Sequence, residues 1–481
     1  MDITIRNIGP IKEASFSVDP LVVLVGPNNA GKSVAATVIY ACLSTSNMPV
    51  ANYRLDRRYS PGSSSGSSNT SDDDWGDLAS FIVDTVGFRN NKEDIFEQIA
   101  EGDHVPPGLR ETITQIVERL FDAYCLSIVD ELERVFGTEI LELRRVQQRA
   151  TKAHITIRST APSWKIDIFI DSKGPNFVVE HPEWQPIWSL MAKHGFRRWG
   201  RFGPSRAMIA REIAIETRRA CFYSLPNRTR YLPAARSGIM QSHKVIASTL
   251  IRQSSWAGLQ DMRIPAMSGV VTDFLSEMIE IDVSYQGPFS KIASQLERGV
   301  LHGSVELRSS RGNSPELVFA TKNGSYPLTR TSSMVSELAP VAVYLKNIIH
   351  AGELLIIEEP EAHLHPASQV AFAQILVRLV NAGLKVVMTT HSEFFLQQLN
   401  NSLAAGSLSQ GEVAHLKFDR ELQIRRDSVG AYTFVPGNRG TIARRLALDA
   451  RYGIPDAGFD TVTEQLYNEN VELDRQLETE N

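Results

Sequence analysis

One segment of the chain has the residue types and spacing of a phosphate-binding loop. Residues 26–33 read GPNNAGKS, which places two glycines, a lysine and a serine at the GxxxxGK[ST] spacing. Glycines let backbone N–H groups turn toward phosphate oxygens, and a helix N-terminus adds its positive end. We therefore expect Lys32 to reach the β- and γ-phosphates of ATP and Ser33 to bind Mg²⁺. The predicted nucleotide-binding residues here are Gly26, Pro27, Asn28, Asn29, Ala30, Gly31, Lys32, Ser33 and Val34.

Two adjacent carboxylates follow an apolar run nearer the C-terminus. Residues 354–357 are apolar, and Glu358, Glu359 and Pro360 follow them, as at the end of a buried strand. One such carboxylate can hold Mg²⁺, and the next can orient and polarise the attacking water. We assign Glu358 to the metal and Glu359 to general-base work. Aspartate is usual at such metal sites, so Glu358 is a departure. The alternative is a pair of solvated glutamates that end a strand.

These side chains need a sheet to position them, and the sequence predicts one. Residues 2–8 and 12–18 alternate polar and apolar residues as strands do. Residues 21–25 form a continuous apolar run, which suits a strand buried on both faces. The run VAATVIYACL after Ser33 predicts a helix. The glycine-rich loop therefore lies between a strand and a helix, and this context separates a phosphate loop from a chance glycine-rich turn.

The rest of the chain alternates between helical and strand-like patterns. Polar low-complexity residues at 60–74 predict a disordered loop or linker. Apolar residues at helical spacing predict an acidic helical tail and helices within 75–150, 240–280, 333–350 and 367–381. Strand-like patterns predict a small sheet at 153–181, hairpins at 304–328, and strands at 354–357, 385–390, 414–418, 422–426 and 431–435.

The composition is that of an ordinary globular protein. The chain has 481 residues, 42% of them hydrophobic and 22% charged, and a formal net charge of −5. No global attraction to nucleic acid or to an anionic membrane is implied. Cys42, Cys125 and Cys221 lack CxxC or metal spacing, which favours buried free thiols in a reducing cytosol. Without a signal-peptide pattern or an apolar run near the roughly 20 residues of a membrane span, a cytoplasmic protein is expected.

The motifs toward both ends of the chain resemble those of the ABC-type ATPases of the RecF, SMC and overcoming-lysogenization-defect (OLD) group. Residues 358–366, EEPEAHLHP, resemble the Walker B motif and D-loop of that group, and residues 386–392, VVMTTHS, resemble its histidine switch. The opening strands and the phosphate loop, ITIRNIGPIKEASFSV followed by LVVLVGPNNAGKS, are also typical of it. No recognised motif covers the insertion between the two ends.

This resemblance implies a fold and a division of the chain. The fold class is α/β, a P-loop NTPase of the ABC-ATPase head type, with a mixed sheet flanked by helices, an antiparallel β-subdomain and a largely helical insertion. Residues 1–50 are expected as the N-terminal lobe of the head and 51–220 as the insertion, with its disordered loop followed by helical and small β elements. Residues 221–400 are expected as the C-terminal lobe, and 401–481 as a C-terminal β/α extension.

The resemblance also implies a homodimer or higher oligomer, because heads of this group bind two ATP molecules between two subunits. A signature segment of one subunit contacts the γ-phosphate that the other subunit holds. The candidate is residues 331–337, TSSMVSE, where Ser332 and Ser333 would supply hydroxyls beside a predicted helix N-terminus. Met334 stands where glycine is usual, which favours slow hydrolysis or a dimer tuned for assembly held by ATP. A plain serine-rich helix cap is the alternative.

Histidines near these motifs receive roles from the same resemblance. His391 would contact the γ-phosphate and sense its presence. It joins Glu359 and Lys32 as the third predicted catalytic residue. His363, His365 and Glu361 are residue types that can ligate a metal ion, but the resemblance places them in the D-loop at the dimer interface.

Arginines alternate with aromatic residues between Arg197 and Arg219. Arginines can pair with phosphates and aromatic rings can stack on bases, so this stretch is a candidate contact for DNA or RNA. The alternative is an amphipathic region whose arginines meet acidic neighbours such as Glu212 and Glu216. Arg236 follows a predicted strand and is expected near the nucleotide or the dimer interface. The arginines of the stretch are Arg197, Arg198, Arg201, Arg206, Arg211, Arg218 and Arg219.

The sequence favours an ATPase, hydrolysing ATP to ADP and phosphate, without an evident effector module. The segment after His391 lacks the glutamate and paired aspartates of a Toprim nuclease, and 75–150 is too short for a long coiled-coil arm. Our leading hypothesis is a sensor or scaffold subunit of a prokaryotic anti-phage defence system that controls a separate effector, expected to be a nuclease. It resembles the stand-alone ATPases of Septu- and PARIS-type systems. The alternatives are a RecF-like, ATP-dependent DNA-repair protein and a nucleotide-dependent scaffold that scarcely hydrolyses ATP.

Overall fold

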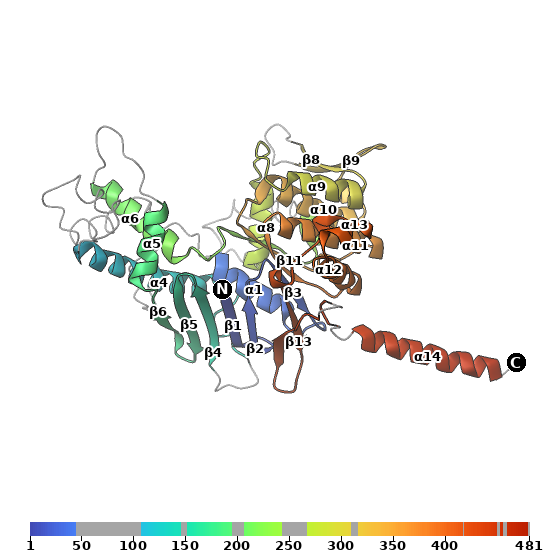
Figure 1. The fold of residues 1–481 in the computed structure, drawn as a ribbon, viewed down its shortest axis with the longest axis horizontal. Helices are drawn as coiled ribbons and strands as arrows, with labels where there is room; N and C mark the ends of the chain where they lie inside the picture. Colours follow the sequence, from blue (N-terminus) through green and yellow to red (C-terminus); the bar gives the residue numbers. More distant parts are fainter. Residues whose placement is uncertain are drawn as a thin grey trace, which may run out of the picture.

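The protein is built around one large mixed sheet. In a computed structural model, the described residues are 1–44, 107–145, 152–194, 206–242, 267–308, 316–416, 418–449, 453–455 and 459–479. Within them, the 11-stranded sheet has the order β6-β5-β4-β1-β2-β14-β13-β3-β12-β11-β7, and a three-stranded sheet has the order β10-β9-β8 (Figure 1). The loop predicted at 60–74 lies outside the described residues.

The strands that carry the predicted motifs pair in parallel. β3 (Leu21–Val25) lies between β12 (Lys385–Thr389) and β13 (Val429–Val435), and β11 (Leu354–Glu358) lies between β12 and β7 (Thr229–Leu232). The strands predicted at 21–25, 354–357, 385–390 and 431–435 are thus confirmed. Their carboxyl ends lie at one edge of the sheet.

These central strands are buried on both faces, which explains their continuous apolar runs. In β3, Val22 and Leu24 pack into one hydrophobic core and Leu21, Val23 and Val25 into the other. The first core also includes α1 (Lys32–Ser44) and α4 (Pro107–Phe136). The second core includes α8 (Gly269–Ile279), α9 (Ser290–Leu296), α10 (Ser333–Val343), α11 (Pro366–Asn381) and α12 (Glu393–Ala405).

An antiparallel region continues the sheet on the other side. β1 (Asp2–Ile8) and β2 (Ile11–Ser17) form the predicted pair, and β4 (Ala153–Thr160), β5 (Ser163–Asp171) and β6 (Gly174–Glu180) follow from β1 in antiparallel order. The strands expected at 153–181 are confirmed, but they extend the main sheet and do not form a separate small one. Isoleucines of β1 and β4 share one fully buried core, and β4 pairs the backbone edge of β1 that would otherwise be open.

The remaining elements follow the predicted pattern in part. The hairpins expected at 304–328 are confirmed as one three-stranded sheet, and the helices expected near 333–350 and 367–381 are confirmed as α10 and α11. Of the helical range expected across 240–280, residues 240–242 and α8 lie inside the described residues and are helical. The further elements are α5 (Trp184–His194), α6 (Arg206–Cys221), β8 (Ser304–Arg308), β9 (Glu316–Thr321) and β10 (Gly324–Pro327).

The C-terminal part departs from the prediction. The strands expected at 414–418 and 422–426 are wrong. Helix α13 (Gln410–His415) covers the start of the first range. In the second range, residues 423–425 have no regular structure and lie between two 3-10 turns (Arg420–Leu422 and Arg426–Ser428). The Asp419 side chain caps the first turn by accepting a hydrogen bond from the Glu421 backbone N–H. Strand β14 (Thr441–Arg445), which the sequence analysis missed, pairs with both β13 and β2.

The acidic tail is helical, as predicted. Helix α14 (Phe459–Thr479) points away from the rest of the described chain, toward the C-terminus in Figure 1. Its Leu466, Tyr467 and Leu473 are exposed. None of the described helices is long and apolar enough to cross a membrane. The three cysteines are buried free thiols, as expected, and burial raises the pKa of Cys42 and of Cys125 to about 12.

Candidate nucleotide-binding site

The predicted motifs meet at one edge of the main sheet. The phosphate loop follows β3, the acidic pair stands at the end of β11, and His391 follows β12. Because these strands are parallel and β12 lies between the other two, their carboxyl ends lie side by side. The structure therefore brings together Lys32, Glu358, Glu359 and His391, which are far apart in the sequence.

The phosphate loop has a backbone that needs its glycines. Gly26 has a φ of 138° and Gly31 a φ of 98°, both in the region that favours glycine. A Cβ on Gly26 would lie 2.7 Å from the Phe434 backbone oxygen, so β13 packs directly against the loop. Pro27, Asn28 and Asn29 are exposed. These exposed residues directly precede α1, the position that a phosphate-binding loop occupies.

Lys32 is the first residue of α1 and its side chain is buried. Its Nζ donates hydrogen bonds to the backbone oxygens of Gly26 at 2.9 Å and Pro27 at 2.8 Å. Burial lowers the pKa of Lys32 to about 8, although the charges of Glu359 and Glu361 act in the opposite direction. The ammonium thus lies within its own loop, satisfied by carbonyl groups that a phosphate could replace.

Glu358 is a buried carboxylate in which one of the two oxygens lacks a hydrogen-bond partner among the described residues. Its Oε2 accepts a hydrogen bond from the Ala234 backbone N–H at 3.2 Å, while its Oε1 is buried without a hydrogen-bond partner. The Tyr231 hydroxyl lies near this carboxylate. Burial raises the pKa of Tyr231 well above its usual value, and the charge of Glu358 raises it further. A buried carboxylate oxygen is costly when nothing donates to it or coordinates it.

Magnesium fits this carboxylate. Mg²⁺ binds proteins through one or two oxygen ligands and completes its shell with phosphate oxygens and water. Glu358 Oε1 is such an oxygen, and the Ser33 side chain is exposed at the start of α1. Within the described residues, no group of three or more His, Cys, Asp and Glu side chains could hold a metal by itself. Glu358 and Ser33 are the residues that would hold Mg²⁺ beside a nucleotide.

Glu359 has a strained backbone and an accessible carboxylate. Its φ is 41°, in the left-handed region that a non-glycine residue seldom adopts. Its N–H points to Thr389, with the backbone oxygen at 3.1 Å and the hydroxyl at 3.2 Å. The side chain is 43% exposed, and its Oε1 lies 3.9 Å from His391 Nε2. Backbone strain of this kind gathers at functional sites, where the surroundings hold it in place.

Glu361 holds the backbone in front of His391, a contact that the sequence analysis did not foresee. Its Oε1 accepts hydrogen bonds from the His391 N–H at 2.5 Å and the Thr390 hydroxyl at 2.9 Å. Burial raises the pKa of Glu361. For His391, burial first and then the charge of Lys32 lower the pKa, which favours the neutral imidazole. In the sequence, the signal for this contact was the carboxylate of Glu361, two residues after Glu359.

The signature candidate lies at the start of α10. Ser332 is the N-cap of this helix, and its hydroxyl accepts a hydrogen bond from the Val335 N–H at 3.4 Å. Ser332 and Ser333 are both exposed, and Met334 Sδ accepts a hydrogen bond from the Ser368 hydroxyl at 3.7 Å. Of the hydrogen bonds and ion pairs between described residues, none joins these serines to the residues of the phosphate loop or of the acidic strand end.

The other candidates from the sequence have different surroundings. The arginine-rich stretch between Arg197 and Arg219 lies partly outside the described residues, which include Arg206 onward. In α6, Arg219 pairs with the buried carboxylate of Glu216 at 2.6 Å, which is the structural alternative considered above. His365 caps α11 by accepting a hydrogen bond from the Ala367 N–H at 3.3 Å.

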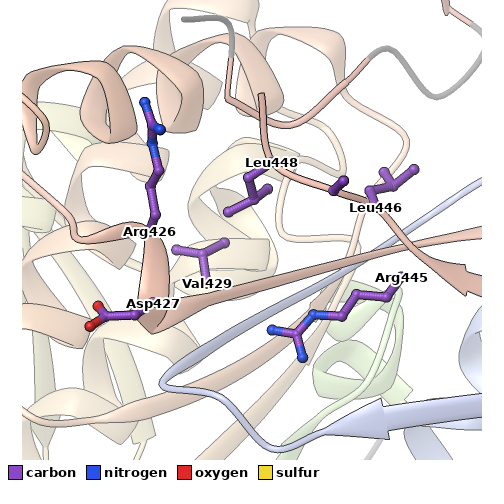
Figure 2. Close-up of a pocket in the computed structure, with 7 residues that line it drawn as sticks. Arg426, Asp427, Val429, Arg445, Leu446 and Leu448 are labelled. Atoms are coloured by element: carbon purple, nitrogen blue, oxygen red, sulfur yellow. The ribbon is translucent and has the colours of Figure 1, made fainter. Parts of the chain in front are cut away.

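A cavity of about 480 Å³ lies at the opposite edge of the sheet from the phosphate loop. It forms where β13 begins and β14 ends, and the first residue of β13 pairs with the first residue of β3. Figure 2 shows its lining, which mixes charged and apolar side chains and includes Arg426, Asp427, Val429, Arg445, Leu446 and Leu448. Arg445 already pairs with Asp19 at 2.8 Å. None of the predicted site residues lines this cavity.

Comparison with known families supports an ATPase. Residues 253–396 match the family model described as an AAA ATPase domain. The matched range includes the signature candidate, the acidic pair and His391, and it ends in α12. No curated protein matches the chain.

Solved structures of SMC heads resemble the chain at low similarity. The chain is 10% identical to an SMC head bound to the C-terminal winged-helix domain of ScpA, with a TM-score of 0.42 over 93% of this chain and 98% of that one. An SMC head domain from Thermotoga maritima is 9% identical, with a TM-score of 0.34 over 93% of this chain and 98% of that one. A Pyrococcus furiosus SMC head with an extended coiled coil, bound to the C-terminal domain of ScpA, is 10% identical, with a TM-score of 0.39 over 98% of each chain. Similarity at this level does not identify a family.

Proposed function

We propose that the protein binds ATP with Mg²⁺ and hydrolyses it at the carboxyl edge of its main sheet. The observation that carries this proposal is the meeting of Lys32, Glu358, Glu359 and His391 at the ends of adjacent parallel strands. Lys32 exchanges its carbonyl partners for phosphate oxygens. Mg²⁺, when bound, would neutralise phosphate charge beside Glu358 and Ser33.

Glu359 is the general base in this proposal. Its backbone is fixed while its carboxylate remains accessible, so it can accept a proton from a water molecule directed at the γ-phosphate. His391 lies within reach of the same space, with its backbone held by Glu361. A neutral imidazole can donate one hydrogen bond to a phosphate oxygen, and this is the role we propose for it.

ATP turnover tests this assignment. We expect measurable hydrolysis by the intact chain and a loss of about 100-fold in kcat for Glu359→Gln, with nearly unchanged ATP binding because the substitution keeps the shape of the side chain. Glu180→Gln, at an exposed glutamate of the distant strand β6, is the matched control and should leave kcat unchanged. A turnover rate that Glu359→Gln does not change would remove Glu359 as the base and favour a slowly hydrolysing scaffold.

We further propose that the site is completed by a second copy of the chain. Ser332 and Ser333 are exposed at a helix N-terminus, where backbone N–H groups favour an anion. They are exposed and form no hydrogen bond to the phosphate loop among the described residues, so they are available for the γ-phosphate held by another subunit. ATP would then stabilise a homodimer or larger oligomer. Sedimentation velocity of Glu359→Gln with and without ATP should show a dimer only with the nucleotide.

The cellular role that we propose is a sensor or scaffold subunit of a prokaryotic anti-phage defence system, acting on a separate effector, expected to be a nuclease. Its support is the resemblance of the motifs to stand-alone ATPases of Septu- and PARIS-type systems. Plating phage on cells that carry the gene with its neighbours tests this role. We expect protection that disappears with Lys32→Ala. Equal plaque counts with and without the intact genes would contradict it.

A further inference from the structure

Arg236 is a buried cation beside the acidic strand end. It follows β7 after a turn in which Ala235 has a φ of 54°, and its side chain is fully buried. Its Nη1 donates hydrogen bonds to the backbone oxygens of Glu358 at 2.8 Å and Pro233 at 2.9 Å, and its Nη2 donates to the backbone oxygen of Glu359 at 3.4 Å. One guanidinium thus holds the carbonyl groups of both acidic residues.

The same guanidinium also holds the helix of the signature candidate. Its Nε donates to the Glu337 backbone oxygen at 3.2 Å and forms an ion pair with Glu337 Oε2, also at 3.2 Å. The other carboxylate oxygen of Glu337 accepts hydrogen bonds from the N–H and the hydroxyl of Ser237, at 3.2 Å and 2.9 Å. Glu337 is fully buried in α10, about one turn beyond Ser333. Arg236 therefore joins α10 directly to the end of β11.

Stability alone does not account for this arrangement. A fully buried ion pair is often matched or exceeded in stability by apolar side chains of similar volume, because both charges lose their hydration. Apolar side chains cannot, however, donate hydrogen bonds to the carbonyl groups of Glu358 and Glu359. Glu359 needs such support, because its left-handed backbone is held on the N–H side by Thr389 and on the carbonyl side by Arg236.

We propose that Arg236 is a positioning residue that couples α10 to the catalytic geometry of Glu359. This inference rests on the proposed function. A γ-phosphate contact at the N-terminus of α10 moves or fixes Glu337, and the guanidinium transmits this to the carbonyl group of Glu359. The direction of the Glu359 carboxylate then depends on whether α10 is engaged. Hydrolysis therefore depends on docking of the second subunit, whereas ATP binding by Lys32 does not depend on that docking.

The test replaces the buried pair by apolar side chains and compares it with a second buried pair. The variant is Arg236→Met with Glu337→Met. The matched control is Arg230→Met with Glu353→Met, a second buried Arg–Glu pair, in which Arg230 lies in β7 and Glu353 directly precedes β11. Arg230 also pairs with Glu277, and none of the hydrogen bonds or ion pairs of Arg230 with described residues reaches a predicted site residue. Both variants, and each combined with Ser333→Ala, are measured for ATP binding stoichiometry, Kd, and kcat. Glu337→Gln, which keeps the side-chain shape, gives the same comparison if the double variant does not fold.

We expect the Arg236 variant to bind ATP with wild-type stoichiometry and Kd while kcat falls by about 100-fold, the loss expected when a catalytic group is misplaced by about 1 Å. Ser333→Ala should lower kcat in the wild-type and control backgrounds and add nothing in the Arg236 background. The proposal is overturned if kcat equals that of the control, if binding capacity falls together with kcat, or if the effect of Ser333→Ala is undiminished. A wild-type chain without turnover overturns the proposed function itself.

Discussion

The buried ammonium of Lys32 predicts that ATP affinity depends on pH between 7 and 9. Burial lowers its pKa from 10.5 to about 8 in the free protein. A shift of this size corresponds to about 3 kcal/mol between the two protonation states. Phosphate oxygens carry negative charge, so bound ATP must raise this pKa again. Binding is therefore strongest when Lys32 is already protonated, and binding above pH 8 has to take up a proton.

The size of the effect follows from the titration. With a pKa of about 8, the protonated fraction of Lys32 falls from about nine-tenths at pH 7 to about one-tenth at pH 9, so the Kd for ATP should rise about tenfold. Calorimetric titration in buffers of different ionisation enthalpy would measure both the Kd and the proton uptake. An ordinary exposed lysine would leave the Kd unchanged over this range.

Lys32→Ala is the control for this measurement. It should bind ATP weakly, and any pH dependence that remains in it belongs to ATP or to other groups. Subtracting that remainder isolates the contribution of Lys32. A wild-type Kd that is the same at pH 7 and pH 9, or a pH dependence that Lys32→Ala retains in full, would show that Lys32 does not titrate on ATP binding.

Three further substitutions have expected outcomes. Gly26→Ala should abolish ATP binding without unfolding the protein, because its Cβ would lie 2.7 Å from the Phe434 oxygen at a φ of 138°; nucleotide titration and circular dichroism check the two parts. Ser332→Ala should lower the free energy of unfolding by about 1 kcal/mol through loss of the N-cap, measured by urea denaturation. Arg230→Ala should lower it by about 3–5 kcal/mol, because the buried carboxylate of Glu353 loses its ion-pair partner.

The sequence predicted the parts of the candidate site whose backbone geometry is local. The spacing of Gly26, Gly31 and Lys32 reports a backbone shape within a few residues, and apolar runs before the loop and before Glu358 identify strands buried on both faces. Parallel pairing of those strands then places the motifs together, because parallel strands end at a common edge.

Contacts between distant segments could not be predicted in the same way. Glu361 holds the backbone of a residue 30 positions away, and Arg236 contacts residues more than 100 positions away. Neither distance leaves a periodic signal in one sequence. The wrong strands at 414–418 and 422–426 lie in a region of short elements: a short helix ends at His415, and 3-10 turns, the first capped by Asp419, flank residues 423–425. The placement of 153–181 depended on the open edge of β1, which only the folded sheet reveals.

If one ATP site is built from two copies of the chain, as we propose, mixing two inactive variants should restore ATP turnover. Lys32→Ala removes the phosphate-binding lysine, and Ser333→Glu places a negative charge where the partner's γ-phosphate would bind. A mixed dimer contains one site with both residues intact. We predict that each variant alone is inactive and that an equal mixture recovers about a quarter of wild-type ATP turnover, as random pairing gives. A mixture as inactive as its components would contradict the shared site.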